Sequence, residues 1–298
     1  MPCKQAIPQH KMTSHSPHGI YMRNLKDDDL PAPETVSRPH RDDHFLFIFQ
    51  ECGENQLVID SQTVTAKGRK VLCILPGQVH HVIKFDPVDA WFVAVTADLV
   101  PEQVRVLLHQ AKQPIVPTDV SDRWVVKLKN GVSLLQLHLE DSSFTDDSFQ
   151  LIKAATESVL LMFAAIYREQ TGLTASKEGR AASLTRQFKT LLQHHYKEIK
   201  SPAAYAAMLN VSPAYLNEVV CNSTGMAVSK WIHQEVMLEA KRMLYYTDFT
   251  VKEISAELGY DDHAYFARLF SKVAGTSPAK YRAAASCRPV SNSVRNPE

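Results

Sequence analysis

Four residues in the last third of this 298-residue sequence are of types that could read bases or bind phosphate. Arg268 can donate two hydrogen bonds to guanine O6 and N7, and Asn217 can pair with the edge of adenine. Glu218 can accept a hydrogen bond from a cytosine amine. Lys272, one helical turn after Arg268, suits a phosphate oxygen. These side chains can act together only if helices present them on an outer surface.

A second group of reactive side chains lies in the first third of the chain. His40, Asp42 and His44 fall within RPHRDDHF, residues 38–45, and His80 falls within PGQVHH, residues 76–81. Imidazoles and carboxylates are ligands that transition metals accept. The same groups also line polar pockets or satisfy one another, so their types alone leave both alternatives open.

The pattern around Arg268 predicts a helix, a tight turn and a second helix within residues 250–282. Thr250 and Glu253 have the spacing of a capping box, which starts a helix. Gly259 suits a left-handed turn, and Asp261 or Asp262 caps the second helix. The second helix has an inward apolar face, and its front edge and outer side carry His263, Ala264, Tyr265, Arg268 and Lys272.

Residues 201–225 predict a first unit with the same plan. Asn210 takes the turn, because Asn tolerates the left-handed conformation better than other residues with a Cβ. Ser212 is the expected N-cap and Pro213 the first helical residue. The outward positions are Ala214, Tyr215, Asn217 and Glu218. A helix over residues 227–246, about 30 Å long, joins the two units, which matches about one turn of DNA.

This segment resembles the DNA-binding domain of the AraC/XylS family of bacterial transcriptional regulators. The residues that carry the resemblance are AKRML at 240–244, VKEISAELGYDDHAYFARLFSK at 251–272 and GTSPAKYR at 275–282. The resemblance implies sequence-specific binding to double-stranded DNA. The base-reading positions that it implies are Ala214, Asn217 and Glu218 in the first unit and His263, Ala264, Tyr265 and Arg268 in the second.

The chain departs from the family pattern at three positions. Glu218 and Cys221 stand where relatives commonly have Arg or Lys, and Val236 stands where the linking helix usually has Arg. These departures imply that the first unit binds phosphate weakly and that the second unit dominates.

The front of the chain predicts a β domain. Apolar runs of strand length at 44–51, 56–60, 71–75, 79–85 and 90–96 are separated by turn residues, which is typical of a sandwich or small barrel. The family resemblance implies a cupin-like barrel that binds a small effector, followed by helices that dimerise. The expected pocket residues are His44, Leu46, Ile48, Leu57, His80, Val82 and Trp91.

The resemblance also sharpens the metal question. A cupin metal site would require His-x-His followed by Glu four or five residues later, whereas the carboxylate that follows FLFIF is Glu51, two or three residues late. We therefore expect no metal and no cofactor, and interpret the polar set as part of a pocket.

Helical periodicity predicts three helices after the strands, at residues 101–110, 122–139 and 146–170. The third is apolar well beyond one stripe, so it is buried within its domain or against a second subunit. A homodimer through residues 146–170 is thus one expectation. No apolar run reaches the roughly 20 residues of a membrane span.

Charge and cysteine content narrow the classes of protein. Residues 1–178 contain 18 Lys and Arg against 22 Asp and Glu, and residues 179–298 contain 15 against 10, so the half with the paired helices is basic. Such a charge favours a polyanionic partner. Five widely spaced cysteines without a C-x-x-C pair, and a polar N-terminus without a signal sequence, favour the cytoplasm.

These observations predict an α+β chain of two domains: a loose lead-in at 1–37 with one strand at 19–22, a cupin-like effector-binding and dimerisation domain at 38–172, a linker at 173–183, a DNA-binding domain with two helix-turn-helix units at 184–284 and a disordered tail at 285–298. The expected function is transcriptional regulation rather than catalysis, with DNA, a small effector and RNA polymerase as partners. Two alternatives remain: a metal-dependent cupin enzyme fused to a DNA-binding domain, and a ligand-independent regulator whose front domain only dimerises. The sequence leaves the effector, the operator, the regulated genes, the direction of regulation and the oligomeric state open.

Overall fold

The computed structural model describes residues 6–16, 18–25, 37–85, 89–110, 117–141, 145–171 and 179–286. Contacts divide the chain into two compact units, one covering Ile7–Ala175 and one containing Ser176–Glu298. We call them the front unit and the helical unit.

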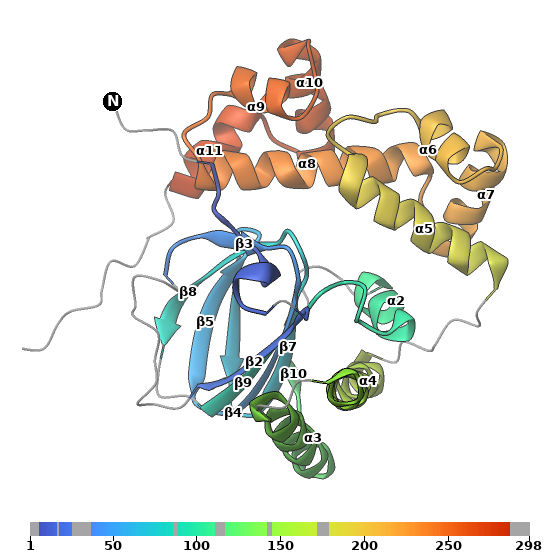
Figure 1. The fold of residues 1–298 in the computed structure, drawn as a ribbon. Coiled ribbons are helices and arrows are strands. Elements are labelled where there is room, and N and C mark those ends of the chain that lie inside the picture. Colours follow the sequence, from blue (N-terminus) through green and yellow to red (C-terminus); the bar gives the residue numbers. More distant parts are fainter. Residues whose placement is uncertain are drawn as a thin grey trace, which may run out of the picture. The chain divides into compact units, whose positions relative to one another are not determined.

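The described strands of the front unit form two five-stranded sheets (Figure 1). Sheet A has the order β1 (Gln9–His10), β3 (His40–Asp42), β8 (Val79–Phe85), β5 (Glu54–Ile59) and β6 (Gln62–Lys67). Sheet B has the order β10 (Thr118–Asp119), β7 (Lys70–Ile74), β4 (Phe45–Cys52), β9 (Asp89–Val95) and β2 (Ile20–Leu25). A front domain built on β-sheets is confirmed, but its two sheets are hydrogen-bonded separately instead of forming one closed barrel.

The dense apolar run at residues 45–49 fits its place in β4, because both faces of this strand are buried. Phe47 and Phe49 belong to the core that sheet B shares with helices, while Ile48 belongs to the core between the sheets. Successive side chains point to opposite faces of a strand, so a strand buried on both sides needs no polar alternation.

Three helices cover the outer face of sheet B: α2 (Glu102–Gln110), α3 (Asp122–Glu140) and α4 (Asp146–Thr171) (Figure 1). The rings of Phe47 in β4 and Phe163 in α4 meet edge to face, with centroids 5.4 Å apart. All three helices were predicted. Of the described segments, residues 146–170 alone are long and apolar enough to cross a membrane, which is weak evidence because Val159, Phe163 and Ile166 are buried in this core.

The N-terminal segment corrects the prediction of a loose lead-in. Strand β2 pairs with β9 from Ile20↔Val95 to Leu25↔Ala90, β1 pairs with β3, and a short 3-10 helix, η1 (Met12–Ser14), lies between them. The expected strand at 19–22 is thus longer. Strand β2 lies at the edge of sheet B, where polar side chains are tolerated, and its polar residues therefore hid the rest of the strand from the sequence pattern.

The other strands compare closely with the predictions. β4, β5, β7, β8 and β9 lie within two residues of their expected ranges. β6 was missed, because its turn contains no glycine: Asp60 and Ser61 take φ of 47° and 69°. Such a two-residue turn closes the β5–β6 hairpin.

The helical unit contains seven helices in its described part: α5 (Arg180–His195), α6 (Pro202–Met208), α7 (Pro213–Thr224), α8 (Val228–Tyr246), α9 (Val251–Glu257), α10 (His263–Ala274) and α11 (Pro278–Ser286). The predicted linker at 173–183 overlaps α5, which begins at Arg180. Residues 173–178 and 287–298 lie outside the described residues.

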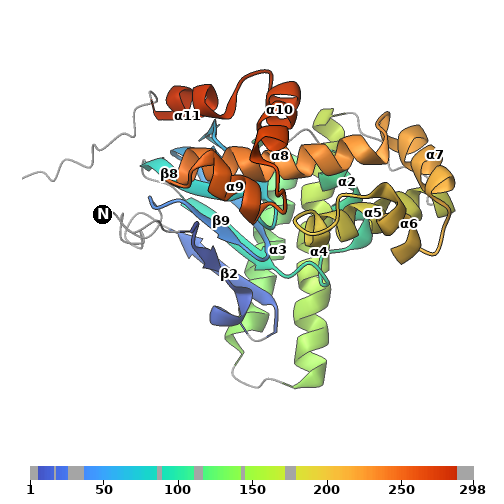
Figure 2. The ribbon, with the colours of Figure 1, turned by 90° about the horizontal axis from the view of Figure 1, so that it is seen from above.

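Helix α8 is more than the spacer that its length suggested, because it belongs to two hydrophobic cores. Figure 2 shows α8 running from α7 at one end to α9 and α10 at the other. Its first half places Val228 and Ile232 with α5, α6 and α7. Its second half places residues from Val236 to Leu244 with α9 and α10. Tyr196 packs against both cores. Each helix-turn-helix unit therefore has its own core, built on one shared helix.

Candidate nucleic-acid interface

The second helix-turn-helix unit is held by the caps that the sequence predicted. Thr250 Oγ1 accepts a hydrogen bond from the Glu253 backbone N–H at 3.2 Å, and Glu253 Oε2 accepts one from the Thr250 N–H at 2.7 Å. Asp262 is the cap of α10, accepting from the N–H groups of Ala264 and Tyr265 at 2.8 and 3.0 Å. These backbone bonds lower the pKa of Asp262 below its ordinary value. The front of α10 is thereby fixed.

Gly259 forms the turn of this unit for two reasons. Its φ is +74°, the left-handed region that favours glycine. A Cβ at this position would also lie 2.1 Å from the carbonyl oxygen of Lys197, which follows α5. The turn between α9 and α10 therefore fits directly against backbone of the first unit.

The outer side of α10 is solvent-exposed. His263, Ala264 and Lys272 are exposed, as is Tyr265. The side chain of Arg268 is 70% exposed, and its Nη2 lies 4.0 Å from Asp262 Oδ2. A contact that long between two exposed groups holds Arg268 only weakly, so its guanidinium can reach a ligand. The opposite side of α10 is buried through Phe266, Leu269 and Phe270.

The first unit confirms the predicted turn and cap. Asn210 has φ 55°, and Ser212 Oγ accepts from the Tyr215 N–H at 3.2 Å. Pro213 occupies the first helical position of α7. Ala214, Tyr215, Asn217 and Glu218 are exposed. Both second helices thus present an outward face that contains the predicted residues.

Asn217 has an internal role that the sequence did not indicate. Its Oδ1 accepts a hydrogen bond from the Val228 N–H at 3.1 Å, at the first residue of α8. A bidentate contact with adenine uses both the oxygen and the amide NH2 of Asn. Asn217 can read adenine in that way only if it gives up the Val228 N–H.

The C-terminal motif GTSPAKYR closes the second unit. Gly275 ends α10 with φ 73°, and Tyr281 meets Phe270 edge to face at 5.8 Å. Arg282 donates to the carbonyl oxygens of Leu244, Thr247 and Phe249 at 3.2, 3.4 and 2.5 Å. These carbonyls lie at and beyond the end of α8, so Arg282 satisfies acceptors that the helix itself leaves free.

Two residues of α8 that entered the resemblance are structural here. Val236 is fully buried in the core of the second unit, so the residue that stands in place of the usual Arg has no access to phosphate. Arg242 is also buried, and it donates from Nη1 to Glu239 Oε2 at 3.2 Å.

The seven expected pocket residues do not share one cavity. Ile48, Leu57 and Val82 line a cavity of about 70 Å3 between the sheets, and Leu46 packs in the same core. Trp91 faces the helices, because Phe49 pairs with Trp91 and the next residue, Phe92, takes the inner face with Ile48. Placing Trp91 in the inner pocket was therefore wrong.

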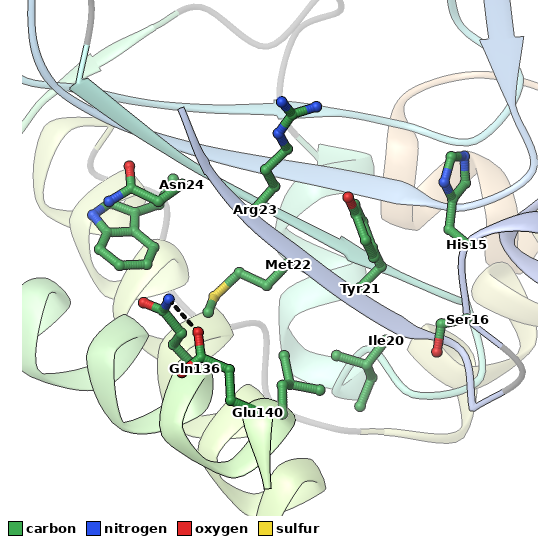
Figure 3. A pocket seen from close by; sticks show the side chains of 11 residues that line it. His15, Ser16, Ile20, Tyr21, Met22, Arg23, Asn24, Gln136 and Glu140 are labelled. Carbon is green, nitrogen blue, oxygen red and sulfur yellow. Dashed lines mark hydrogen bonds between the residues drawn. The ribbon is translucent and has the colours of Figure 1, made fainter. Parts of the chain in front are cut away.

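Trp91 instead lines a larger, open pocket between β2 and α3, with a volume of about 710 Å3. Figure 3 shows Met22 of β2 beside Gln136 and Glu140 of α3, whereas Arg23 lies on the other side of the strand. Asn24 also lines it, and its Oδ1 is buried without a hydrogen-bond partner among the described residues. The sequence missed this pocket because β2 was only partly predicted.

His44 and His80 lie in neither of these cavities but in a cluster of side chains around the buried carboxylate of Asp42. Asp42 Oδ2 lies 3.8 Å from His44 Nε2 and 3.5 Å from His80 Nε2, and its Oδ1 lies 3.6 Å from His10 Nδ1. The rings of His10 and His40 stack at 4.4 Å. The sequence missed His10, because nothing indicated that residues 9–10 pair with β3.

Comparison with known proteins agrees with the helical unit. Residues 205–284 match a family model described as a helix-turn-helix domain. The arabinose operon regulatory protein of Escherichia coli is 31% identical over 81 residues, 27% of this chain and 28% of that protein. The transcriptional activator RhaS of Escherichia fergusonii is 23% identical over 254 residues, 84% of this chain and 89% of that protein.

A solved structure, the C-terminal domain of the response regulator AraT from Geobacillus stearothermophilus, is 28% identical and covers 39% of this chain and 95% of that domain, with a TM-score of 0.35. The chain spans less than half the length of the arabinose operon regulators it matches. The arabinose operon regulatory protein and RhaS are regulators of transcription, and residues 205–284, which match the family model, contain the capped helices α7 and α10. Residues 205–284 therefore belong to the AraC-type helix-turn-helix domains.

Proposed function

We propose that this protein is a sequence-specific DNA-binding transcriptional regulator that acts in the cytoplasm and contacts RNA polymerase. The observation that carries the proposal is the pair of capped helices, α7 and α10, each with one buried face and one exposed face. A helix of this kind fits the major groove, about 12 Å wide, with its N-terminal residues at base edges. The basic charge of the helical half supports a phosphate-rich partner.

Within this interface α10 is the main reader. Arg268 is exposed and weakly held, so it can donate to guanine, and Lys272 one turn later binds phosphate. His263, Ala264 and Tyr265 stand at the front of α10, where base edges are closest. In α7 the corresponding positions are Ala214, Tyr215, Asn217 and Glu218, without a cation.

The test begins with selection of bound fragments from a random DNA pool by the full-length protein. Arg268→Ala should then weaken binding to the selected site by about 5- to 150-fold, or roughly 1–3 kcal/mol, and relax the preference at one base pair. Lys272→Ala should weaken binding to all sequences and make its dependence on salt less steep. Lys153→Ala, an exposed charge in α4, is the control for the loss of a positive charge. An Arg268→Ala variant with unchanged preference would contradict the assignment.

Asn217 offers a test that separates reading from capping. Asn217→Asp keeps an oxygen for the Val228 N–H and places a negative charge at the start of α8, which is favourable. It removes the amide donor that adenine needs. If Asn217 reads a base, Asn217→Asp should keep its unfolding midpoint and lose affinity for the selected site. If it only caps α8, affinity should stay and Asn217→Ala alone should be less stable.

We further propose that the front unit, a cupin-like fold, binds a small effector in the pocket between β2 and α3. Its volume of about 710 Å3 is within the usual range of small-molecule sites, roughly 300–1,000 Å3, whereas the cavity between the sheets is too small. The buried Oδ1 of Asn24, which meets no donor in the described part of the chain, supplies an acceptor. A metabolite screen by thermal shift should find a compound whose stabilisation is lost in Asn24→Ala; stabilisation unchanged in that variant would place the compound elsewhere.

The predicted homodimer is proposed to use exposed apolar residues of two helices. Helix α4 buries most of its apolar side chains in its own domain but leaves Leu151 53% exposed. Helix α3 exposes Val126, Leu134 and Leu137 by 61%, 49% and 66%. Sedimentation analysis should give a dimer that Leu137→Glu and Leu151→Glu convert to monomer, with Lys153→Glu as the control.

A further inference from the structure

The cluster around Asp42 leaves several lone pairs facing one carboxylate. His80 Nδ1 lies 3.2 Å from the carbonyl oxygen of Gln78, and His40 Nδ1 lies 2.9 Å from the carbonyl oxygen of Arg38. A carbonyl oxygen can only accept, so each ring must carry a proton on Nδ1. The neutral form of each ring then has its lone pair on Nε2.

His44 is held in the same way. Its Nδ1 lies 3.0 Å from Asp43 Oδ1, a carboxylate oxygen that accepts. Its Nε2 and that of His80 are directed at Asp42 Oδ2, at 3.8 and 3.5 Å. A lone pair facing a carboxylate oxygen without a proton between them is repulsive, and a cation between them removes that repulsion.

The hydrogen bonds that the Nδ1 atoms of these histidines make are the kind found around metal-bound histidine. A ligating imidazole usually donates its other N–H to a carbonyl or carboxylate, which fixes both the tautomer and the ring orientation. His40, His44 and His80 each have such a partner.

The separations are also those of ligands around an ion. The ligand atoms of His10, His40 and Asp42 all lie within 4.8 Å of one another. His80 is outside this group of three and adjoins it through Asp42, with its Nε2 3.5 Å from Asp42 Oδ2. Nitrogen and oxygen atoms about 2.0–2.2 Å from a tetrahedral zinc ion are roughly 3.3–3.6 Å apart. The 3.6 Å from Asp42 Oδ1 to His10 Nδ1 agrees with that edge, and so does the 3.5 Å from the other carboxylate oxygen, Oδ2, to His80 Nε2. Neither pair is close enough for a good direct hydrogen bond, so the two oxygens of Asp42 each face one imidazole nitrogen.

We propose that the front unit binds one divalent transition-metal ion through His10, His40 and Asp42, with His80 as the fourth ligand. A set of three imidazoles and one carboxylate suits zinc and the neighbouring first-row ions and not calcium or magnesium, which prefer oxygen. Asp42 and His80 are 6% and 5% exposed, while the His10 side chain is 44% exposed and leaves the ion a path from solvent.

The ion would join parts of the chain that few other contacts hold together. His10 is in β1, His40 and Asp42 are in β3, and His80 is in β8, so one ion crosses three neighbouring strands of sheet A. Strand β1 has only two residues, paired as Gln9↔Arg41 and His10↔Asp42. The ion therefore fastens the N-terminal strand to the sheet.

The test uses the tag-free, full-length protein after removal of metal with a chelator. Cobalt(II) is added and the visible absorption is followed, since the strength of the bands reports four-coordinate binding, and zinc is then used to displace it. We expect one cobalt ion per chain, displaced by one zinc, and a higher unfolding midpoint with zinc. His10→Ala and His80→Ala should each weaken binding at least 10-fold, whereas His194→Ala, an exposed histidine of α5, should leave it unchanged.

Asp42→Asn tests the carboxylate, but a buried substitution can unfold the domain, so circular dichroism accompanies it. His10→Ala is the decisive variant because its side chain is partly exposed and its loss leaves the core intact. No uptake of cobalt or zinc at micromolar concentration, or uptake that His10→Ala and His80→Ala leave unchanged, overturns the proposal. Neither result bears on DNA binding, which depends on the helical unit.

Discussion

Substituting Gly259 by alanine tests how the two helix-turn-helix units are fitted together. Three glycines of the helical unit, Gly225, Gly259 and Gly275, have nearly the same left-handed φ, 73°, 74° and 73°. A Cβ at Gly225 or Gly275 would meet no described residue within 4 Å, whereas at Gly259 it would lie 2.1 Å from the Lys197 carbonyl oxygen. The three positions therefore separate the cost of the backbone conformation from the cost of the close approach.

The magnitudes follow from this difference. Gly275→Ala costs only the left-handed conformation of a residue with a Cβ, about 1–2 kcal/mol. Gly259→Ala costs the same amount plus the displacement of backbone, which cannot move aside like the end of a flexible side chain. Overpacking of this kind costs about 1–3 kcal/mol, so the total is about 2–5 kcal/mol. The displacement should also disturb the packing between α5 and the α9–α10 turn.

Native-state hydrogen exchange with mass spectrometry measures the effect, because it resolves the helical unit from the front unit in the full chain. For amides of α8 and α10 we expect exchange in Gly275→Ala to be faster by about 5- to 30-fold, and in Gly259→Ala by about 30-fold or more. Peptides of the front unit should be unchanged. If Gly259→Ala and Gly275→Ala exchanged at the same rate, the close approach to Lys197 would carry no energy and the reasoning would fail.

Three further predictions concern caps and buried charge. Thr250→Ala should destabilise the second unit by about 0.5–2 kcal/mol in denaturant unfolding, whereas Ser201→Ala should have little effect, because the Ser201 side chain accepts no capping hydrogen bond from the described first turn of α6. Arg282→Ala should lower the stability of the second unit by about 1.5–3 kcal/mol, because it removes hydrogen bonds to three carbonyls. Arg282→Lys should not restore that stability, since one ammonium cannot reach all three carbonyls in the same geometry. The thermal unfolding midpoints of the two variants test this. Burial lowers the pKa of His80 to about 4, below the ordinary value of about 6.5, so the unfolded chain takes up this proton first. The metal-free front unit should therefore keep its stability above about pH 6.5 and lose up to about 1.4 kcal/mol per pH unit between pH 6.5 and 4, and unfolding of His80→Gln at pH 7.5 and 5 should show a smaller loss.

The helix-turn-helix units could be predicted because their signals are local. The Thr250–Glu253 box, the N-caps Ser212 and Asp262 and the left-handed Asn210 each depend on residues within a few positions. A pattern of this kind fixes where a helix begins, which face is buried and which is exposed. The outward sets on α7 and α10 followed from those faces.

Contacts between distant parts of the chain could not be predicted in the same way. The Val228 N–H that occupies Asn217 is 11 residues away, and the carbonyls that Arg282 reaches are 33 to 38 residues away. His10 meets Asp42 only because β1 pairs with β3. Trp91 was misplaced by one residue of strand register, which exchanges the two faces of the sheet.

These long-range contacts also explain why the two units should read DNA unequally. Helix α7 has no cation on its outward face and carries Glu218 there. The amide oxygen of Asn217 in this helix already accepts a hydrogen bond from the Val228 N–H at the start of α8. Helix α10 has Arg268 and Lys272 exposed. The residue that caps this helix, Asp262, is not one of the expected base readers, so capping does not occupy any of them. A side chain that already accepts a hydrogen bond from the backbone must give up that bond before it can bind a base with the same atom. Specificity should therefore concentrate at the half-site read by α10. The half-site under α7 is then expected to tolerate substitutions, a pattern that the selected sequences would reveal as one well-defined and one degenerate element.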